Sequence, residues 1–188
     1  MGCSYSAEIL SLTKLMGQLQ DAGNVTTLTS YLKLLDECAL LTALYKYAND
    51  EARKRNSIPK YQVYNNALMT AYVGRGFVED RTDTLSWGRW VESAVGTHLL
   101  SMAEELDYEV YYWRKPARGK GDKDKEVDFI IKCGGDLTAI EVKSGRRGMN
   151  SGLPAFADAF HPKRSLIVGT GGVSLEDFLG CDLEQFLR

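Results

Sequence analysis

Apolar residues recur at helical spacing over one long stretch in the second half of the chain. Between residues 87 and 106 they fall on every third or fourth position, which predicts a helix of about five turns with one buried face. Ser86, directly before this stretch, is a residue type that caps helix N-termini. The apolar stripe consists of Trp87, Trp90, Val91, Ala94, Val95, His98, Leu99, Met102 and Leu106. We interpret the stripe as core, and His98 within it as a core histidine.

The chain after this helix alternates between apolar and polar side chains, as β-strands do. Residues 108–113 predict one strand, and the segments around 127–131 and 139–143 predict two more, on either side of Gly134 and Gly135. Residues 154–160 predict a short helix, 165–168 a buried strand and 175–179 a terminal helix. The second half therefore predicts the order helix, three strands, helix, strand.

The two glycines predict a tight hairpin that brings two carboxylates together. If Gly134 and Gly135 are the central turn residues, Cys133 faces Asp136 and Asp128 faces Glu141. Directly opposed residues lie about 5 Å apart at Cβ, and like charges there are destabilising. A divalent cation would compensate.

Mg²⁺, or Mn²⁺ in its place, is the cation that this pair fits best. Mg²⁺ binds through one or two carboxylates, keeps several waters and leaves room for phosphate. Lys143 projects from the same strand face as Glu141 and is placed to hold a water or a phosphate oxygen. In the alternative interpretation, Glu126 falls opposite Lys143, and all four residues form a solvated face of mixed charge.

The first half of the chain predicts helices followed by a hairpin. Residues 7–20 predict one helix, and a second begins near Thr26 or Thr27 after a turn at Gly23 and Asn24. Residues 40–47 fit either an extension of that helix or a strand. Residues 49–56 predict an exposed charged loop, and 61–64 alternate as a strand.

This arrangement resembles a winged helix, a module that contacts DNA or protein. Arg53, Lys54 and Arg55 at the tip are placed to touch phosphate, although three cations alone give little binding at physiological salt. A solvated loop is the simpler interpretation. A polar, glycine-containing connection at residues 75–86 separates the two halves. We therefore expect a winged-helix-like region at 1–80 and a second domain at 81–188.

Cationic residues gather beside the predicted hairpin. The segment 114–125 is rich in glycine and charge, which argues against regular structure, and it contains Arg118, Lys120 and Lys123. Arg146 and Arg147 leave the neighbouring strand at the same end. Convergence of the two clusters would suit a polyanionic backbone such as nucleic acid, whereas a flexible solubilising loop also explains the first cluster.

Composition indicates a compact protein. The 188 residues are 44% hydrophobic and 26% charged, which is ordinary globular usage. The net charge of −2 provides no global basic field, so any attraction to nucleic acid is local. The four cysteines form no Cys-x-x-Cys pair, and no apolar run approaches the length of a membrane span. We expect a cytoplasmic location and no membrane partner.

Residues 127–131 and 139–145 together resemble the core of the PD-(D/E)XK nuclease superfamily. In that core an Asp and an acid-x-Lys lie on adjacent strands, here Asp128 and Glu141-Val142-Lys143. Val127 replaces the name-giving proline, which is not a ligand. The resemblance implies a restriction-endonuclease-like αβββαβ core and a metal site formed by Asp128, Glu141 and the Val142 carbonyl. It also implies a supporting acid on the first helix, where Glu92 is the matching position; alternatively, Glu92 is a solvated rim residue.

A more specific resemblance extends over most of the chain. The helical segment around 15–44, the motif Trp87-Gly88-Arg89-Trp90-Val91-Glu92 and the Asp and Glu-x-Lys strands are similar to the domain of unknown function that follows the ATPase module in bacterial and archaeal AAA-type ATPases. The sequence contains no Gly-x-x-x-x-Gly-Lys-Ser/Thr phosphate loop. The resemblance therefore implies a fragment, or a stand-alone prokaryotic relative, that pairs with an ATPase module absent from this chain.

Two functions follow as hypotheses. The first is a Mg²⁺-dependent phosphodiesterase acting on nucleic acid, with DNA as the expected substrate and Asp128, Glu141, Lys143 and Glu92 at the site. The second is a non-catalytic DNA-binding or protein-binding regulatory module on a nuclease scaffold, because function depends on the site and not on the fold.

Overall fold

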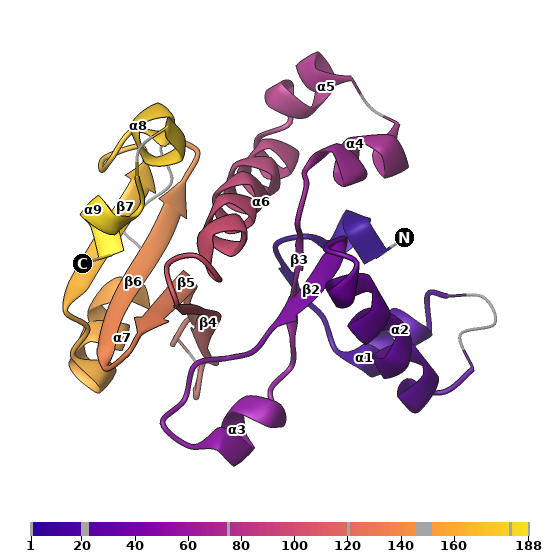
Figure 1. Cartoon of the computed structure of the whole chain (residues 1–188), viewed down its shortest axis with the longest axis horizontal. Coiled ribbons are helices and arrows are strands. Elements are labelled where there is room, and N and C mark those ends of the chain that lie inside the picture. The colour runs from indigo at the N-terminus through magenta and orange to yellow at the C-terminus, as the bar shows by residue number, and fades with distance from the viewer. Residues whose placement is uncertain are drawn as a thin grey trace. The chain divides into compact units, whose positions relative to one another are not determined.

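The protein is a mixed α/β chain with two separate sheets (Figure 1). The structure, a computed structural model, describes residues 2–19, 23–74, 76–119, 121–145, 152–180 and 182–187. The chain divides into two compact units, Met1–Thr97 and His98–Arg188. The long helix α6 (Thr84–Met102) begins in the first unit and ends in the second. The domain boundary near residue 80 that the sequence suggests stays a prediction.

The first unit contains a three-stranded antiparallel sheet in the order β1-β3-β2. Its strands are β1 (Glu8–Ile9), β2 (Leu41–Leu44) and β3 (Lys60–Val63). The helices of this unit that precede α6 are η1 (Gly2–Tyr5), α1 (Leu12–Met16), α2 (Val25–Glu37), α3 (Glu51–Arg55), α4 (Ala67–Val73) and α5 (Phe77–Thr82). Their buried core consists of Leu15, Leu28, Leu41, Tyr61, Val63 and Met69.

The predicted helix over residues 7–20 is wrong in its first part. Ala7 has a φ of 62°, and the next two residues form β1 on the edge of β3. Helix α1 begins only after Ser11, whose hydroxyl accepts the Lys14 N–H at 3.2 Å. Pairing with a central strand thus overrides the helical spacing of a short segment. By contrast, α2 confirms the second predicted helix, with Asn24 as its cap.

The remaining expectations for the first unit are settled by local hydrogen bonds. The undecided segment 40–47 contains strand β2. The predicted loop 49–56 contains α3, because the Asp50 carboxylate accepts the Ala52 N–H at 2.8 Å and caps a short helix. Lys54, expected at an exposed tip, is buried and pairs with Glu51 at 2.5 Å. The predicted connection 75–86 contains α5.

Helix α6 contains most of the predicted apolar stripe, and Val91, Val95 and Leu99 are buried along it. Its start differs from the prediction. Asp83, not Ser86, caps the helix, accepting the N–H of Leu85 at 3.1 Å and the hydroxyl of Ser86 at 2.8 Å. A carboxylate three residues earlier therefore takes the role expected of Ser86.

The second unit contains a four-stranded sheet in the order β4-β5-β6-β7. Strands β4 (Glu109–Lys115), β5 (Lys125–Cys133) and β6 (Asp136–Lys143) are antiparallel, and β7 (Arg164–Gly169) is parallel to β6. Helix α7 (Gly152–Phe160) lies in the crossover that a parallel pair requires. Two short helices follow, α8 (Leu175–Gly180) and α9 (Glu184–Leu187). The predicted order helix, three strands, helix, strand is confirmed.

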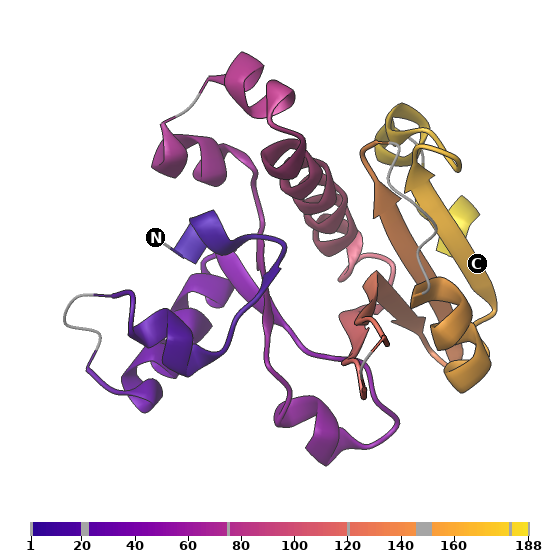
Figure 2. The ribbon, with the colours of Figure 1, turned by 180° about the vertical axis from the view of Figure 1, so that it is seen from behind.

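Helix α7 covers one face of this sheet, as Figure 2 shows from behind. The ring of Phe156 meets the edge of Trp113 in β4, with centroids 5.5 Å apart, and both side chains are buried. Trp113 pairs with Val127 of β5, so Val127 points toward α7. Within the described residues, no helix combines the length and apolar composition needed to cross a membrane.

His98 packs in the second unit, as the apolar stripe predicts. Its ring meets the edge of Phe178 in α8, with centroids 6.0 Å apart. Burial lowers the pKa of His98, and a hydrogen bond with the Phe178 backbone offsets part of that shift. The folded protein therefore favours the neutral imidazole more than the unfolded chain does.

This shift predicts a stability change at mildly acidic pH. The stabilisation by neutral His98 is fully present above the unfolded pKa of about 6.5 and is lost as pH falls toward the lowered folded pKa. Melting temperatures between about pH 7.5 and pH 5, values that bracket this window, should fall less for His98→Gln than for wild type. His161→Gln, at an exposed site, is the control. Equal slopes for wild type and His98→Gln would contradict the assignment.

Candidate functional site

The hairpin between β5 and β6 has the register that the sequence predicts. Gly134 has a φ of 56°, which a residue with a side chain rarely adopts. Cys133 pairs with Asp136, and the ladder continues regularly to Phe129 and Ile140. One further step in the same register places Asp128 opposite Glu141.

Regular main-chain pairing between β5 and β6 ends before this step. Instead of main-chain pairing, the Asp128 carboxylate accepts the Val142 N–H, with Oδ2 2.7 Å from the nitrogen. The N–H and C=O of one strand residue point toward the same neighbour. The Val142 carbonyl is therefore directed toward β5 as well, whereas the Lys143 carbonyl accepts the Thr170 N–H on the other side at 2.8 Å. Carboxylate and carbonyl oxygens thus gather where β5 and β6 separate.

Glu141 and Lys143 complete the group. Glu141 is only 4% exposed, and its carboxylate accepts a hydrogen bond from Lys143 Nζ at 2.7 Å. Glu141 and Lys143 share one strand face. The β4–β5 register shifts beside this point, where Asp128 and Phe129 of β5 together lie opposite Tyr112 of β4. The structure joins the Asp128 carboxylate to Val142, the residue between Glu141 and Lys143.

The alternative of a solvated mixed-charge face fits less well. Glu126 pairs with Arg114 on the β4 side, and its expected place opposite Lys143 lies beyond the last β5–β6 pair, Phe129 and Ile140. Glu141 is buried, and a buried carboxylate is costly unless opposite charge and hydrogen bonds compensate it. A carboxylate on a solvated face would carry no such cost. Here the Lys143 ammonium provides the opposite charge, at 2.7 Å from the Glu141 carboxylate.

The oxygen set fits Mg²⁺ or Mn²⁺ better than a closed structural metal site. Among the described residues, no group of three or more His, Cys, Asp or Glu side chains could hold an ion. Two carboxylates with a nearby carbonyl match the preference of Mg²⁺ for few protein ligands and several waters. Zn²⁺ would require a fuller set of nitrogen or sulfur ligands.

Glu92 has a different environment from the one its matching position implies. It lies in the first unit, where its carboxylate forms an ion pair with Lys60 of β3. The Lys60 side chain is fully buried, and that of Glu92 is 20% exposed. The pairing gives Glu92 a part in the stability of the first unit, and its role as a supporting acid stays a prediction. Sequence reasoning missed Lys60, although a lysine directly before Tyr61-Gln62-Val63 was a signal.

The predicted phosphate contacts lie partly within the described chain. Arg118 and Lys123 are exposed on the turn between β4 and β5. Both donate their backbone N–H groups to the Asp122 carboxylate, at 3.2 and 2.9 Å. Lys120, Arg146 and Arg147 lie outside the described residues.

A glycine turn after β7 supports the end of β6, and the sequence analysis missed it. Gly169 has a φ of 97°, and a Cβ atom there would lie 2.1 Å from the Lys143 carbonyl oxygen. Only glycine allows Thr170 to approach and bond that carbonyl. The β7 side thus holds the backbone of β6 up to Lys143. The run Gly169-Thr170-Gly171-Gly172 was the available signal.

Residues 87–178 match the family model DUF4143, a domain of unknown function. The matched stretch contains Asp128, Glu141 and Lys143, and it runs from α6 into α8. No curated protein and no solved structure matches the chain significantly. The resemblance to a domain of unknown function is thus confirmed over these residues, and the nuclease core stays a proposal.

The ion pair of Lys60 and Glu92 generates a stability prediction. Glu92→Leu leaves a buried ammonium without this carboxylate and should lower the free energy of unfolding by about 3 kcal/mol or more. Lys60→Met should cost less, because Glu92 keeps some contact with water. The double variant Lys60→Met/Glu92→Leu should recover most of the loss. Urea denaturation measures all four proteins, and strictly additive losses would rule out the coupling.

Proposed function

We propose that this protein is a metal-dependent phosphodiesterase that acts on nucleic acid. The observation that carries the proposal is the hydrogen bond of the Asp128 carboxylate with the Val142 N–H, beside the ion pair of the buried Glu141 with Lys143. A pair of acids beside a lysine, where two strands separate, provides the oxygen ligands and the cation that phosphoryl chemistry requires.

Each residue has a distinct proposed role. Asp128 and Glu141 hold Mg²⁺ or Mn²⁺ through carboxylate oxygens, and the Val142 carbonyl is directed to add a third. When bound, the metal would lower the pKa of a coordinated water and neutralise charge on the phosphate oxygens. Lys143 orients a water or a phosphate oxygen, once its ammonium leaves Glu141. Glu92, the candidate supporting acid from the first helix, pairs with Lys60, and its role at the site stays a prediction.

Nucleic acid, with DNA expected, is the proposed substrate because cations lie on the strands that hold these acids. Lys125 is on β5, three residues before Asp128, and Arg118 and Lys123 lie on the adjoining turn. The nuclease-like motif, the winged-helix-like order of the first unit and the resemblance to an ATPase-linked domain support a module that works beside an ATPase.

One observation favours a second candidate, a non-catalytic binding or regulatory module. The Glu141 carboxylate already has the Lys143 ammonium as a partner, so the site has one neutralised acid without any metal. In that case the pair would serve the fold, and the chain would act by contact with DNA or protein.

Metal titration separates the two candidates. Binding at about 100 times the dissociation constant adds about 2.7 kcal/mol to the free energy of unfolding, so Mg²⁺ or Mn²⁺ should raise the melting temperature of wild type by several degrees. Asp128→Asn/Glu141→Gln should lose this rise and also lose metal-dependent cleavage of DNA. Asparagine retains an acceptor for the Val142 N–H, so the hairpin should persist.

The matched control is Glu109→Gln/Asp136→Asn, which removes the same charge from the same sheet at sites paired with Lys132 and Lys163. It should behave as wild type. A wild-type melting temperature indifferent to metal, together with a more stable Asp128→Asn/Glu141→Gln variant, would support the second candidate instead.

Lys143 gives an independent test of the chemistry. Lys143→Gln removes the ammonium and leaves both carboxylates, so metal should still raise the melting temperature, at the same or a lower metal concentration. Cleavage should fall by about 100-fold or more, as for the loss of one charge-stabilising donor. Cleavage at the wild-type rate would show that Lys143 has no part in the reaction.

A further inference from the structure

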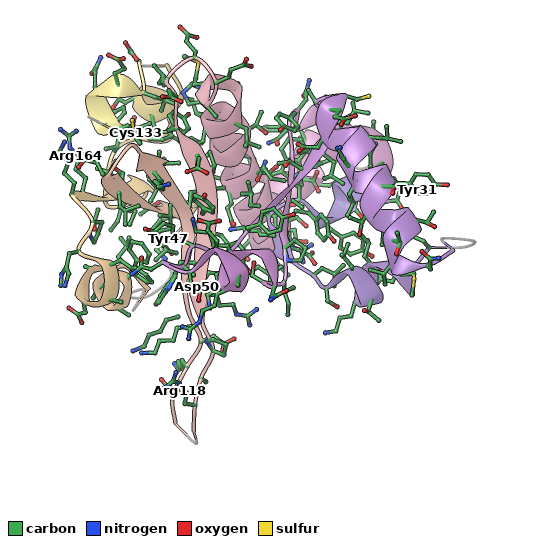
Figure 3. All side chains as sticks on the ribbon, turned by 60° about the horizontal axis from the view of Figure 1, so that its bottom comes forward. Tyr31, Tyr47, Asp50, Arg118, Cys133 and Arg164 are labelled. Carbon is green, nitrogen blue, oxygen red and sulfur yellow. The ribbon has the colours of Figure 1, made fainter. Side chains whose placement is uncertain are left out.

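The outer ends of β4 and β5 form a projecting hairpin, here called the arm (described residues 114–119 and 121–126). Arg114 pairs with Glu126 and Lys115 with Lys125, so regular pairing extends into a segment whose glycine and charge content argued against it. Figure 3 shows Arg118 near the end of this hairpin, beyond the rest of its sheet. The arm is therefore an ordered two-stranded ribbon at its base.

Two acids fix the shape of the turn. The Asp124 carboxylate pairs with Arg114 across the ribbon and accepts the Ala117 N–H at 2.9 Å. The Asp122 carboxylate accepts the backbone N–H groups of Arg118 and Lys123. These hydrogen bonds lower the pKa of both carboxyls. A loop that served only solubility would not need these hydrogen bonds and this ion pair to order it.

While these hydrogen bonds engage the two acids, the cationic residues Lys115, Arg118 and Lys123 are exposed. Residues 114–125 contain six cationic and two acidic residues, against a net charge of −2 for the whole chain. Both acids in that segment are engaged inside the arm. Among the described residues, no salt bridge joins Lys115, Arg118, Lys123 or Lys125 to a carboxylate.

The pair of Lys115 and Lys125 points to an anionic ligand. These lysines are directly opposed in the ladder, an arrangement that costs stability. Asp122 lies near enough to both for their charges to lower its pKa, but this single carboxylate faces two ammonium groups and is bound to the backbone. Phosphate oxygens are the partners that would relieve the remaining repulsion.

We infer that the arm enters the major groove of duplex DNA next to the phosphodiester held at Asp128. The major groove of B-DNA is about 12 Å wide and admits a two-stranded β-ribbon. Strand β5 joins the arm to the site without a break, and Lys125 is about 10 Å from Asp128 along the strand. Phosphates recur about every 3.4 Å along each strand of the duplex, so the arm and the site would contact one continuous backbone.

This inference deepens the proposed function, because it names duplex DNA as the substrate class. A-form RNA has a major groove too deep and narrow for such a ribbon, and a single strand has no groove. The arm therefore predicts preference for duplex DNA over duplex RNA and over single strands of the same sequence.

The test measures binding without cleavage. The full chain with Asp128→Asn/Glu141→Gln is titrated with fluorescent duplex DNA, the matching duplex RNA and single-stranded DNA, between about 50 and 200 mM salt. Adding Lys115→Gln/Lys125→Gln should weaken duplex DNA binding about tenfold at the lower salt and reduce the slope of log affinity against log salt by about 2. Lys115→Arg/Lys125→Arg should retain binding.

The matched control is Lys132→Gln/Lys163→Gln, which removes the same charge at exposed pairs with Glu109 and Asp136. Equal effects of the arm and control variants, or equal affinity for the three nucleic acids, would overturn the inference. Arm-dependent duplex binding without any metal-dependent cleavage would retain the arm and reject the nuclease. Metal-dependent cleavage that the arm variant leaves unchanged would support the nuclease and reject the proposed role of the arm.

Discussion

The hydrogen bond from the Val142 N–H to the Asp128 carboxylate is the interaction on which the candidate site depends. It joins Asp128, one residue before Phe129, to Val142, two residues after Ile140, just beyond the last regular pair of the β5–β6 ladder. A main-chain partner there would close the ladder and leave no space between the strands. Because a side chain takes that place, the regular ladder ends at Phe129 and Ile140, and the Val142 carbonyl is left directed toward β5.

This site is predictable from the sequence because a hairpin register is a local property. A two-residue glycine turn sets which residues oppose each other, and alternation then determines which face each side chain takes. These two rules predict Asp128 beside Glu141 and Lys143, and the hydrogen bond of Asp128 with Val142 agrees with that neighbourhood. The pairing of β4 into residues 114–115 was missed, because glycine and charge content cannot reveal carboxylates such as Asp124 that fasten a turn.

Long-range contacts explain the other differences. Residues 7–9 have helical spacing, but they pair with Tyr61 and Lys60, which are distant in sequence. Glu92 occupies the position that a family motif assigns to metal support. Only the structure reveals that its carboxylate forms an ion pair with Lys60. No local pattern contains the information that a lysine about thirty residues away will be buried beside it.

The ion pairs Lys60–Glu92 and Lys143–Glu141 differ in what they allow. Lys60 is fully enclosed, so its ammonium cannot return to water without unfolding part of the first unit, and the pair with Glu92 is fixed. The Lys143 side chain is 21% exposed beside a Glu141 side chain that is 5% exposed, and the two are joined within a single strand face. An ammonium that reaches solvent can leave its carboxylate when a competing cation arrives, at a cost that its own hydration offsets. Glu141 is therefore an acid with an exchangeable partner, which is the property that a metal ligand needs and that Glu92 lacks.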